Sequence, residues 1–148
     1  MKLFLDTNVL LDLLLEREGY EKAVPVFQLQ EEGKLSLCVS ILTMVNVAYV
    51  YRKTVGQRLA VVNLKFLSSL LEVLPMDGPM LQQAIYREGP DFEDILQGVC
   101  AAEHQCDYIL TNNVADFQIG PGLVSAQLPI PPVLSPEAFL KSSLSLHP

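Results

Sequence analysis

An acidic residue stands at the end of the first apolar run of this chain, and its position limits what the chain can fold into. Residues 3–5 read Leu-Phe-Leu, Asp6 follows at once, and a helical apolar pattern begins directly after it. This order predicts a short buried strand with Asp6 at its carboxyl end. In open α/β sheets ligands bind at that edge, and a buried carboxylate is costly unless a hydrogen-bond donor or a cation meets it. The start of the chain therefore predicts a functional site.

Short apolar runs alternate with amphipathic segments along the chain. Strands are expected at residues 3–5, 35–39, 72–76 and 108–111. Helices are expected from Thr7 or Asn8 to about residue 16 and at residues 20–32, 40–53, 57–71, 80–87, 92–105 and 136–142. The stretch from Gly120 to Pro136 reads as a loop rich in glycine and proline. This alternation predicts an α/β fold, a three-layer α/β/α sandwich with a mostly parallel central sheet.

The length and composition predict a single domain. A chain of 148 residues forms one core with little room for a second, so residues 1–148 are expected to be one unit whose last residues, His147 among them, are disordered. No apolar stretch is long enough for a membrane span, and Asp6 and Asp12 in the first apolar run argue against a signal peptide. Three cysteines without a sign of secretion indicate reduced thiols and a cytoplasmic protein.

The net charge of −7 argues against a surface that binds polyanions in general, because phosphate affinity rests mainly on lysine and arginine. A local basic strip remains, made of Arg52, Lys53, Arg58 and Lys65. Three aromatic side chains interleave with it: Tyr49, Tyr51 and Phe66. Such rings can stack on nucleic-acid bases, but aromatic residues at helical spacing more often belong to the core, and both interpretations stay open.

Three segments place acids or amides where a helix begins or a strand ends. They are residues 6–8 (Asp-Thr-Asn), residues 91–94 (Asp-Phe-Glu-Asp) and residues 108–117, which include Asn112, Asn113 and Asp116. Convergent carboxylates and amides suit Mg²⁺, which takes oxygen ligands. Taken singly, the acids of residues 91–94 are ordinary helix-capping residues, and the later ones are ordinary turn residues. Asp6 has the weakest structural explanation, because Thr7 or Asn8 is available to cap the helix.

Four sequence blocks carry a resemblance to a known family. They are Leu-Asp-Thr-Asn-Val-Leu-Leu-Asp at 5–12, Ser-Ile-Leu-Thr-Met-Val-Asn-Val-Ala-Tyr-Val-Tyr at 40–51, Asp-Phe-Glu-Asp-Ile-Leu-Gln-Gly at 91–98, and Ile-Leu-Thr-Asn-Asn-Val-Ala-Asp-Phe at 109–117. In this order and spacing they resemble the PIN domain, in the branch of toxin components of bacterial toxin–antitoxin pairs. The resemblance extends from Lys2 to about Leu140. It implies an α/β/α fold and a ribonuclease that depends on Mg²⁺ or Mn²⁺.

The resemblance also assigns site residues. The family's first acid falls on Asp6 and its third on Asp94, with Asp91 close by in the same block. The second acid falls on Asn46, and a fourth position falls on Asn113.

Two usual acidic positions are therefore amides, which offer an oxygen but no negative charge. The later acid of the last block falls on Asp116. The implied metal ligands are the carboxylates of Asp6, Asp94 and Asp116 with Asn113, while Asn46 gives neutral support. This charge suffices for one Mg²⁺ with weaker binding than a four-acid site.

The implied mechanism is metal-assisted hydrolysis of RNA. An ion held by Asp6 and Asp94 activates a water for attack on a phosphodiester, and Asp116 or Asp91 orients that water. Thr7 and Thr111 hold the carboxylates through hydrogen bonds. The RNA backbone is expected to meet three basic residues: Arg52, Lys53 and Arg58.

The resemblance implies partners as well as a substrate. A toxin of this kind is neutralised by an antitoxin protein that occupies the acidic groove, and it often forms a homodimer through helices, here those of residues 40–71. An alternative is a catalytically weakened PIN fold that only binds RNA or a protein, which the amides Asn46 and Asn113 motivate.

Other sites with strand-end acids or metal ligands fit less well. A phosphatase of the haloacid dehalogenase type needs an acid where this chain has Asn8. A receiver domain needs a lysine after a late strand, and the last lysine here is Lys141. For zinc, Cys100 and His104 share a helix face, but Cys106 does not and no fourth ligand is apparent. The cysteines are therefore interpreted as buried core residues.

Overall fold

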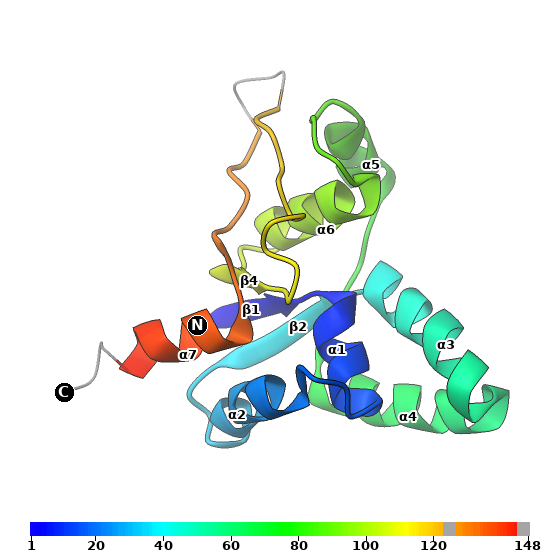
Figure 1. Cartoon of the computed structure of the whole chain (residues 1–148). Helices are drawn as coiled ribbons and strands as arrows, with labels where there is room; N and C mark the ends of the chain where they lie inside the picture. Colours follow the sequence, from blue (N-terminus) through cyan, green and yellow to red (C-terminus); the bar gives the residue numbers. More distant parts are fainter. Residues whose placement is uncertain (123–126, 145–148) are drawn as a thin grey trace.

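A parallel sheet between two layers of helices forms the protein (Figure 1). The structure is a computed structural model that describes residues 1–122 and 127–144. Its strands are β1 (Lys2–Leu5), β2 (Ser36–Ser40), β3 (Glu72–Leu74), β4 (Tyr108–Leu110) and β5 (Val133–Leu134). The predicted three-layer α/β fold is confirmed. The predicted disorder of the last residues, including His147, lies outside the described residues.

The helices follow the predicted segments closely. They are α1 (Thr7–Leu14), α2 (Tyr20–Glu31), α3 (Ile41–Val55), α4 (Gln57–Leu70), α5 (Gly78–Ile85), α6 (Phe92–Glu103) and α7 (Pro136–Leu144). Side-chain oxygens accept from the backbone at the start of five of them: Asp6 at α1, Ser40 at α3, Asp77 at α5, Asp91 at α6 and Ser135 at α7. None of these helices is long and apolar enough to cross a membrane, as far as the described residues go.

The two faces of the sheet bury two separate apolar clusters because strand side chains alternate. Leu3 and Leu5 of β1 point into the first cluster, which is covered by α1, α2, α3, α4 and α7. Phe4 points the other way, into the second cluster beneath α5 and α6. All three side chains are fully buried. A central parallel strand buried on both faces reads as a continuous apolar run, which is why residues 3–5 gave so clear a signal.

The strand order β3-β2-β1-β4-β5 places a topological switch at the centre of the sheet. From β1 the chain moves outward to β2 and β3, then returns to place β4 and β5 on the other side of β1. Leu5 pairs with Leu110, so β1 and β4 end side by side. Ligands of open α/β sheets bind at such a switch point, outside the carboxyl ends of the strands. Asp6 and Thr111 are the residues that directly follow these two strands.

One predicted loop is partly a strand. Val133 and Leu134, within the stretch expected to be a loop, pair with Ile109 and Leu110 as β5. Arg87 also forms an isolated antiparallel bridge with Gly122. A strand of two residues has no periodicity that a sequence can reveal, and its pairing depends on the neighbouring β4. The loop prediction for residues 120–136 was therefore wrong at this point.

Candidate active site at the carboxyl edge of the sheet

Asp6 lies at the switch point and is held on both carboxylate oxygens. Its Oδ1 accepts a hydrogen bond from the Thr7 backbone N–H at 2.7 Å, and its Oδ2 accepts one from the Thr111 hydroxyl at 2.8 Å. Asp6 is only 4% exposed. Burial raises the pKa of its carboxyl, the bonds from Thr111 and the α1 backbone oppose that rise, and the charge of Asp91 adds to it. Two hydrogen-bond donors thus hold this buried carboxylate at the sheet edge.

Asp6 is also the N-cap of α1, in extended backbone conformation. The expectation that Thr7 or Asn8 caps this helix was therefore wrong. The physical reason is that the chain turns directly from strand into helix, so the residue between them has the extended backbone that an N-cap requires. Asp6 consequently has a structural role as well as its place in the site.

The two predicted supporting threonines act differently. The Thr111 hydroxyl donates to Asp6 and accepts from the backbone N–H of Asn113 at 3.1 Å, so it links the carboxylate to the loop after β4. Thr7 bonds Asp6 through its backbone, whereas its hydroxyl is buried without a hydrogen-bond partner in the described part of the chain. An unpartnered hydroxyl beside a buried carboxylate is uncommon.

The first turn of α6 brings more acids to this edge. Asp91 accepts from the backbone N–H groups of Glu93 and Asp94, at 2.8 and 3.4 Å. The half-buried Asp94 has its pKa raised to about 7, first by burial and then by the charges of Asp6, Asp91, Glu93 and Asp116. These charges act on Asp94 only because the acids converge. The charges of Asp6 and Asp116 thus both act on Asp94. The exposed Asn113 lies on the loop after β4, where its backbone bonds Thr111 and Asp116.

Glu93 is a member of this cluster that the sequence did not single out. Its Oε1 accepts a hydrogen bond from Asn46 Nδ2 of α3 at 2.5 Å. Burial raises the pKa of the Glu93 carboxyl, the amides of Gln97 and Asn46 oppose that rise, and the charges of Asp6 and Asp91 add to it. The available signal was the presence of three acids in residues 91–94, more than a helix cap requires.

A neutral polar network lies next to these acids and is completely buried. The Ser40 hydroxyl donates to Gln97 Oε1 at 2.5 Å, and Gln97 Nε2 donates to the Thr43 hydroxyl at 3.0 Å. The Thr43 backbone N–H in turn donates to the Ser40 hydroxyl at 2.9 Å. All three side chains are 0% exposed. This network joins the start of α3 to the middle of α6 and so fixes how the two helices lie relative to each other.

The acid cluster lacks a balancing cation. Within residues 1–122 and 127–144, no lysine or arginine forms an ion pair with any of the five acids, which are Asp6, Asp91, Glu93, Asp94 and Asp116. Their oxygens and the unpartnered Thr7 hydroxyl fit a hard divalent cation in chemistry and charge. The same described residues contain no ready group of three or more His, Cys, Asp or Glu that could hold an ion.

The basic residues predicted to meet RNA lie along α3 and α4. Arg52 and Lys53 occupy the last turn of α3 and approach the Tyr49 ring, at 5.2 and 4.0 Å from its centroid. Arg58 is exposed in the first turn of α4. Arg52 lies six positions after Asn46 on α3, a rise of about 9 Å, so this strip begins at some distance from the acids.

The aromatic residues of this region divide between surface and core. Tyr49 and Phe66 are exposed at 53% and 58%, whereas Tyr51 is buried in the first apolar cluster. The core interpretation therefore holds for Tyr51, and only the other two rings are accessible to a base.

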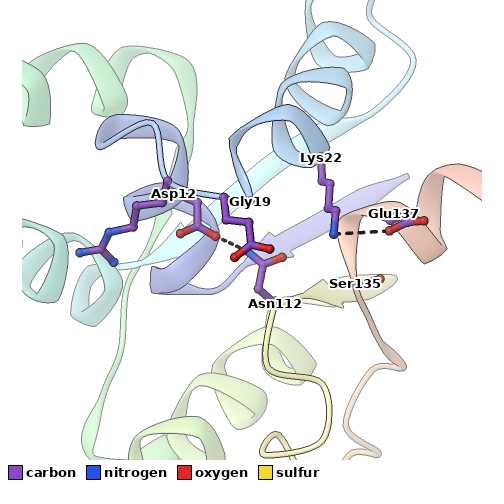
Figure 2. A pocket seen from close by; sticks show the side chains of 8 residues that line it. Asp12, Gly19, Lys22, Asn112, Ser135 and Glu137 are labelled. Carbon is purple, nitrogen blue, oxygen red and sulfur yellow. Dashed lines mark hydrogen bonds and ion pairs between the residues drawn. The ribbon is translucent and has the colours of Figure 1, made fainter.

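A hollow of about 520 Å³ lies at the same edge, on the β4–β5 side (Figure 2). It is lined by Asp12, Arg17, Glu18, Gly19, Lys22, Asn112, Ser135 and Glu137. Asn112 donates to the Asp12 carboxylate, and Lys22 forms an ion pair with Glu137 at 3.6 Å. A side chain at position 19 would displace the Asp12 carboxylate from its place beside Asn112. Arg17 and Lys22 thus lie at the edge of the sheet where the acids lie, and the sequence did not single them out.

The three cysteines belong to the interior, as expected. Cys38, Cys100 and Cys106 are at most 7% exposed and lie in the second apolar cluster. The sulfur atoms of Cys38 and Cys106 are 3.4 Å apart. His104 Nε2 lies 3.0 Å from the carbonyl oxygen of Pro75. These side chains are engaged in core and helix-end contacts.

One family model and several solved structures match this chain. The family model described as the PIN domain matches residues 2–115. No curated protein matches the sequence. The DNA-bound VapBC from Salmonella typhimurium is similar in structure, with a TM-score of 0.65, 19% identity, and coverage of 92% of this chain and 98% of that one.

Two further structures show the same likeness. VapBC2 from Rickettsia felis, bound to a promoter DNA fragment, has a TM-score of 0.63 and 15% identity, covering 91% of this chain and 98% of that one. VapC20 from Mycobacterium tuberculosis, a toxin that cleaves the sarcin-ricin loop, has a TM-score of 0.58 and 16% identity, covering 72% and 86%. At these identities the likeness establishes a shared fold.

Proposed function

The chain belongs to the PIN domain family, and we propose that it is a ribonuclease that depends on Mg²⁺ or Mn²⁺. The observation that carries the proposal is the convergence of five acids, without a balancing cation among the described residues, at the switch point of the sheet. The pKa values of the Asp6, Glu93 and Asp94 carboxyls are raised, by burial first and then by neighbouring acids, which is unfavourable for stability and typical of a functional site. We propose Asp6, Asp94 and Asp116 as the charged ligands and Asn113 as a neutral one.

The proposed chemistry follows from the position of the carboxylates at the carboxyl edge of the sheet. A divalent cation at these carboxylates would neutralise charge on an RNA phosphodiester and lower the pKa of a water molecule. Thr111 and the Thr7 backbone keep Asp6 oriented toward the edge. Asp91 is engaged with the α6 backbone, so we propose it as a support for Asp94 and not as a ligand.

We propose two places where the RNA backbone meets basic side chains. One is the predicted strip of Arg52, Lys53 and Arg58 on α3 and α4. The other is the hollow that Arg17 and Lys22 line beside Asn112. The second place is supported by its position at the carboxyl ends of β4 and β5, the edge to which Asp6 also belongs.

We further propose that the protein is the toxin of a toxin–antitoxin pair and acts in the cytoplasm as a homodimer. The shared fold with VapBC proteins supports the pairing, and three buried free thiols suit a reducing compartment. The dimer is supported by exposed apolar side chains on α3 and α4, including Val45, Val62 and Phe66. An antitoxin segment that covers the acids would carry cationic side chains to match their charge.

The test is cleavage of structured and unstructured RNA by the purified protein in Mn²⁺ or EDTA. Cleavage is expected only with Mn²⁺, and Asp6→Asn and Asp94→Asn are each expected to reduce it by more than about a hundredfold, because loss of a group that merely supports a ligand already costs about 10–100-fold. Asn is itself a good N-cap, so Asp6→Asn keeps the fold of α1.

The matched control is Asp107→Asn, an exposed acid at the opposite, amino edge of the sheet whose oxygen accepts from the Lys2 backbone. This variant is expected to cleave as the wild type does. The ribonuclease proposal is wrong if the wild type does not cleave RNA, or if both site variants cleave it as the wild type does.

A binding module without catalysis is the second candidate. It is favoured by the amides at positions 46 and 113 and by the lack, in the described residues, of a ready metal-binding group. Under this alternative the protein would bind RNA equally well in Mn²⁺ and in EDTA, and Mn²⁺ would not raise its melting temperature.

A further inference from the structure

Two of the three buried thiols lie in direct contact with each other. The Sγ atoms of Cys38 and Cys106 are 3.4 Å apart, although 68 positions separate the two residues in the sequence. Both residues belong to the second apolar cluster, and they are 1% and 7% exposed. A buried cysteine packs as a small apolar side chain, and packing alone does not require a second sulfur at this distance. The contact therefore brings together two groups that can react with each other.

The two cysteines lie in parts of the fold that differ in regularity. Cys38 lies in β2, where it pairs with Phe4 of β1. Cys106 lies in the turn between α6 and β4. The sulfur atoms of a disulfide are about 2.05 Å apart, so the two Sγ atoms have to approach by about 1.4 Å from their present distance. A side chain in a turn can supply this movement without disturbing the pairing of the strands.

The surroundings make the two thiols unequal. The pKa of the Cys106 thiol is lowered by a hydrogen bond from the Cys38 thiol, burial opposes this effect, and the positive charge of Lys2 adds to it. The pKa of the Cys38 thiol is raised, first by its bond to Cys106 and then by burial. Cys106 is therefore the thiol that ionises first, and it is also the more exposed one. Since the thiolate is the nucleophilic form, Cys106 suits the attacking role and Cys38 the resolving role.

We propose that Cys38 and Cys106 are a modification site at which hydrogen peroxide forms an intramolecular disulfide. The Cys106 thiolate attacks a peroxide oxygen, so that an S–O bond forms, the O–O bond breaks, and the departing hydroxide takes up a proton to become water. The Cys38 sulfur then attacks the Cys106 sulfur, so that the S–S bond forms and the S–O bond breaks. The second oxygen leaves as water with the Cys38 proton. Two thiols and one peroxide thus give one disulfide and two waters, and the sulfur atoms supply both electrons.

This disulfide would stabilise the sheet without involving the candidate active site. It joins β2 to the turn before β4, and β1 lies between these two strands. It also closes a loop of 68 positions, and disulfides that close long loops restrict the unfolded chain most. Cys106 directly precedes Asp107, which bonds the Lys2 backbone at the amino end of β1, whereas the acids of the candidate site lie at the carboxyl end. The thiol pair is therefore independent of the proposed ribonuclease activity.

The test is mass spectrometry of the purified full chain, first reduced and then exposed to a small excess of hydrogen peroxide. The protein is denatured and alkylated with N-ethylmaleimide. Because the chain has three cysteines, the reduced protein is expected to carry three labels and the oxidised protein one, which peptide mapping locates on Cys100. The melting temperature is expected to rise by about 5–15 °C on oxidation and to return to its first value in dithiothreitol.

The matched control is Cys100→Ala, because Cys100 lies in the same cluster but its Sγ lies 3.9 Å from the carbonyl oxygen of Pro75. This variant is expected to lose both of its labels on oxidation. Cys106→Ala is expected to keep both of its labels, and Cys38→Ala to retain a sulfenic acid on Cys106 that dimedone traps.

The wild type alone decides the outcome, so a variant that fails to fold leaves the test intact. Three results would overturn the proposal. The wild type keeps all three labels after peroxide, or Cys106 is oxidised without a bond to Cys38, or the disulfide joins Cys100 or two separate chains.

Discussion

Two sets of polar side chains join α3 to α6, and they differ in charge and burial. The first set is Ser40, Thr43 and Gln97, which are neutral, fully buried and bonded to one another. The second set is Asn46 with Glu93, which lies one helical turn away, is more exposed and joins the acids of the sheet edge. The two links between these helices therefore differ in charge and burial, although the Gln97 amide of the first also acts on the Glu93 carboxyl of the second.

The first set stabilises the fold, whereas the second set places charged groups at the edge of the sheet. Buried neutral groups with their hydrogen bonds satisfied favour a single arrangement of the helices. Acids that raise one another's pKa oppose stability, and they persist where a ligand or a reaction needs them. We propose that the neutral link serves the structure and that the charged link belongs to the candidate site.

The largest expected effect concerns the hydroxyl that holds Asp6 at the charged side. Thr111→Val removes the 2.8 Å bond to the Asp6 carboxylate and the 3.1 Å bond from Asn113. RNA cleavage in Mn²⁺ is expected to fall by about 10–100-fold, as for other groups that orient metal ligands. Thr111→Ser retains the hydroxyl and is expected to retain most of the activity. Equal activity in Thr111→Val and the wild type would show that Asp6 needs no such support.

On the neutral side, Gln97→Leu is expected to lower the free energy of unfolding by about 1–3 kcal/mol, because the buried Ser40 and Thr43 hydroxyls lose their bonds to the Gln97 amide. Urea denaturation measures this change. The control is Gln82→Leu, an exposed glutamine of α5, with an expected change within about 0.5 kcal/mol. If Gln97→Leu were as stable as the wild type, the neutral link would not fix the two helices.

The acids at the sheet edge are expected to lower the stability of the metal-free protein, whereas the neutral network raises it, and the effect of the acids is the smaller one. The pKa of Asp94 is about 7 in the folded protein and 3.8 in its ordinary, unfolded setting. Between these values the folded state binds more protons than the unfolded state, so the free energy of unfolding falls as the pH rises through this window. In EDTA the melting temperature is therefore expected to be higher at pH 5 than at pH 8.

Asp94→Asn tests whether Asp94 causes this pH dependence, because the substitution removes the carboxyl whose pKa is raised to about 7. Its metal-free melting temperature is expected to exceed that of the wild type at pH 8 and to vary less with pH. Saturating Mn²⁺ should likewise raise the wild-type melting temperature most at pH 8, since metal binding requires ionised carboxylates. A wild type more stable at pH 8 than at pH 5 in EDTA would contradict the repulsion inferred here.

The sequence predicted the parts of the fold that depend on local pattern. The run at residues 3–5 identified β1, and the acid after it identified the edge of the sheet, because a central parallel strand is apolar throughout. The helices at residues 41–55 and 92–103 followed from their apolar spacing and their caps. Family membership agrees with the predicted resemblance.

The parts that the sequence did not predict depend on contacts between distant segments. β5 exists because Val133 and Leu134 pair with β4, and two residues carry no period of their own. The cap role of Asp6 depends on the direct turn from β1 into α1. The Asn46–Glu93 bond depends on how two helices lie relative to each other, which no spacing within either helix encodes. The roles of Asp6, Asp94 and Asp116 as metal ligands stay predictions.

The central claim is that the acids at the switch point bind a divalent cation, and anomalous diffraction from crystals grown with Mn²⁺ tests it most directly. The account predicts a peak within about 2.5 Å of carboxylate oxygens of both Asp6 and Asp94, and no such peak in crystals of Asp94→Asn. A wild-type crystal in which Mn²⁺ is absent from this edge, or is found only on exposed acids such as Asp107 or Glu21, would contradict it.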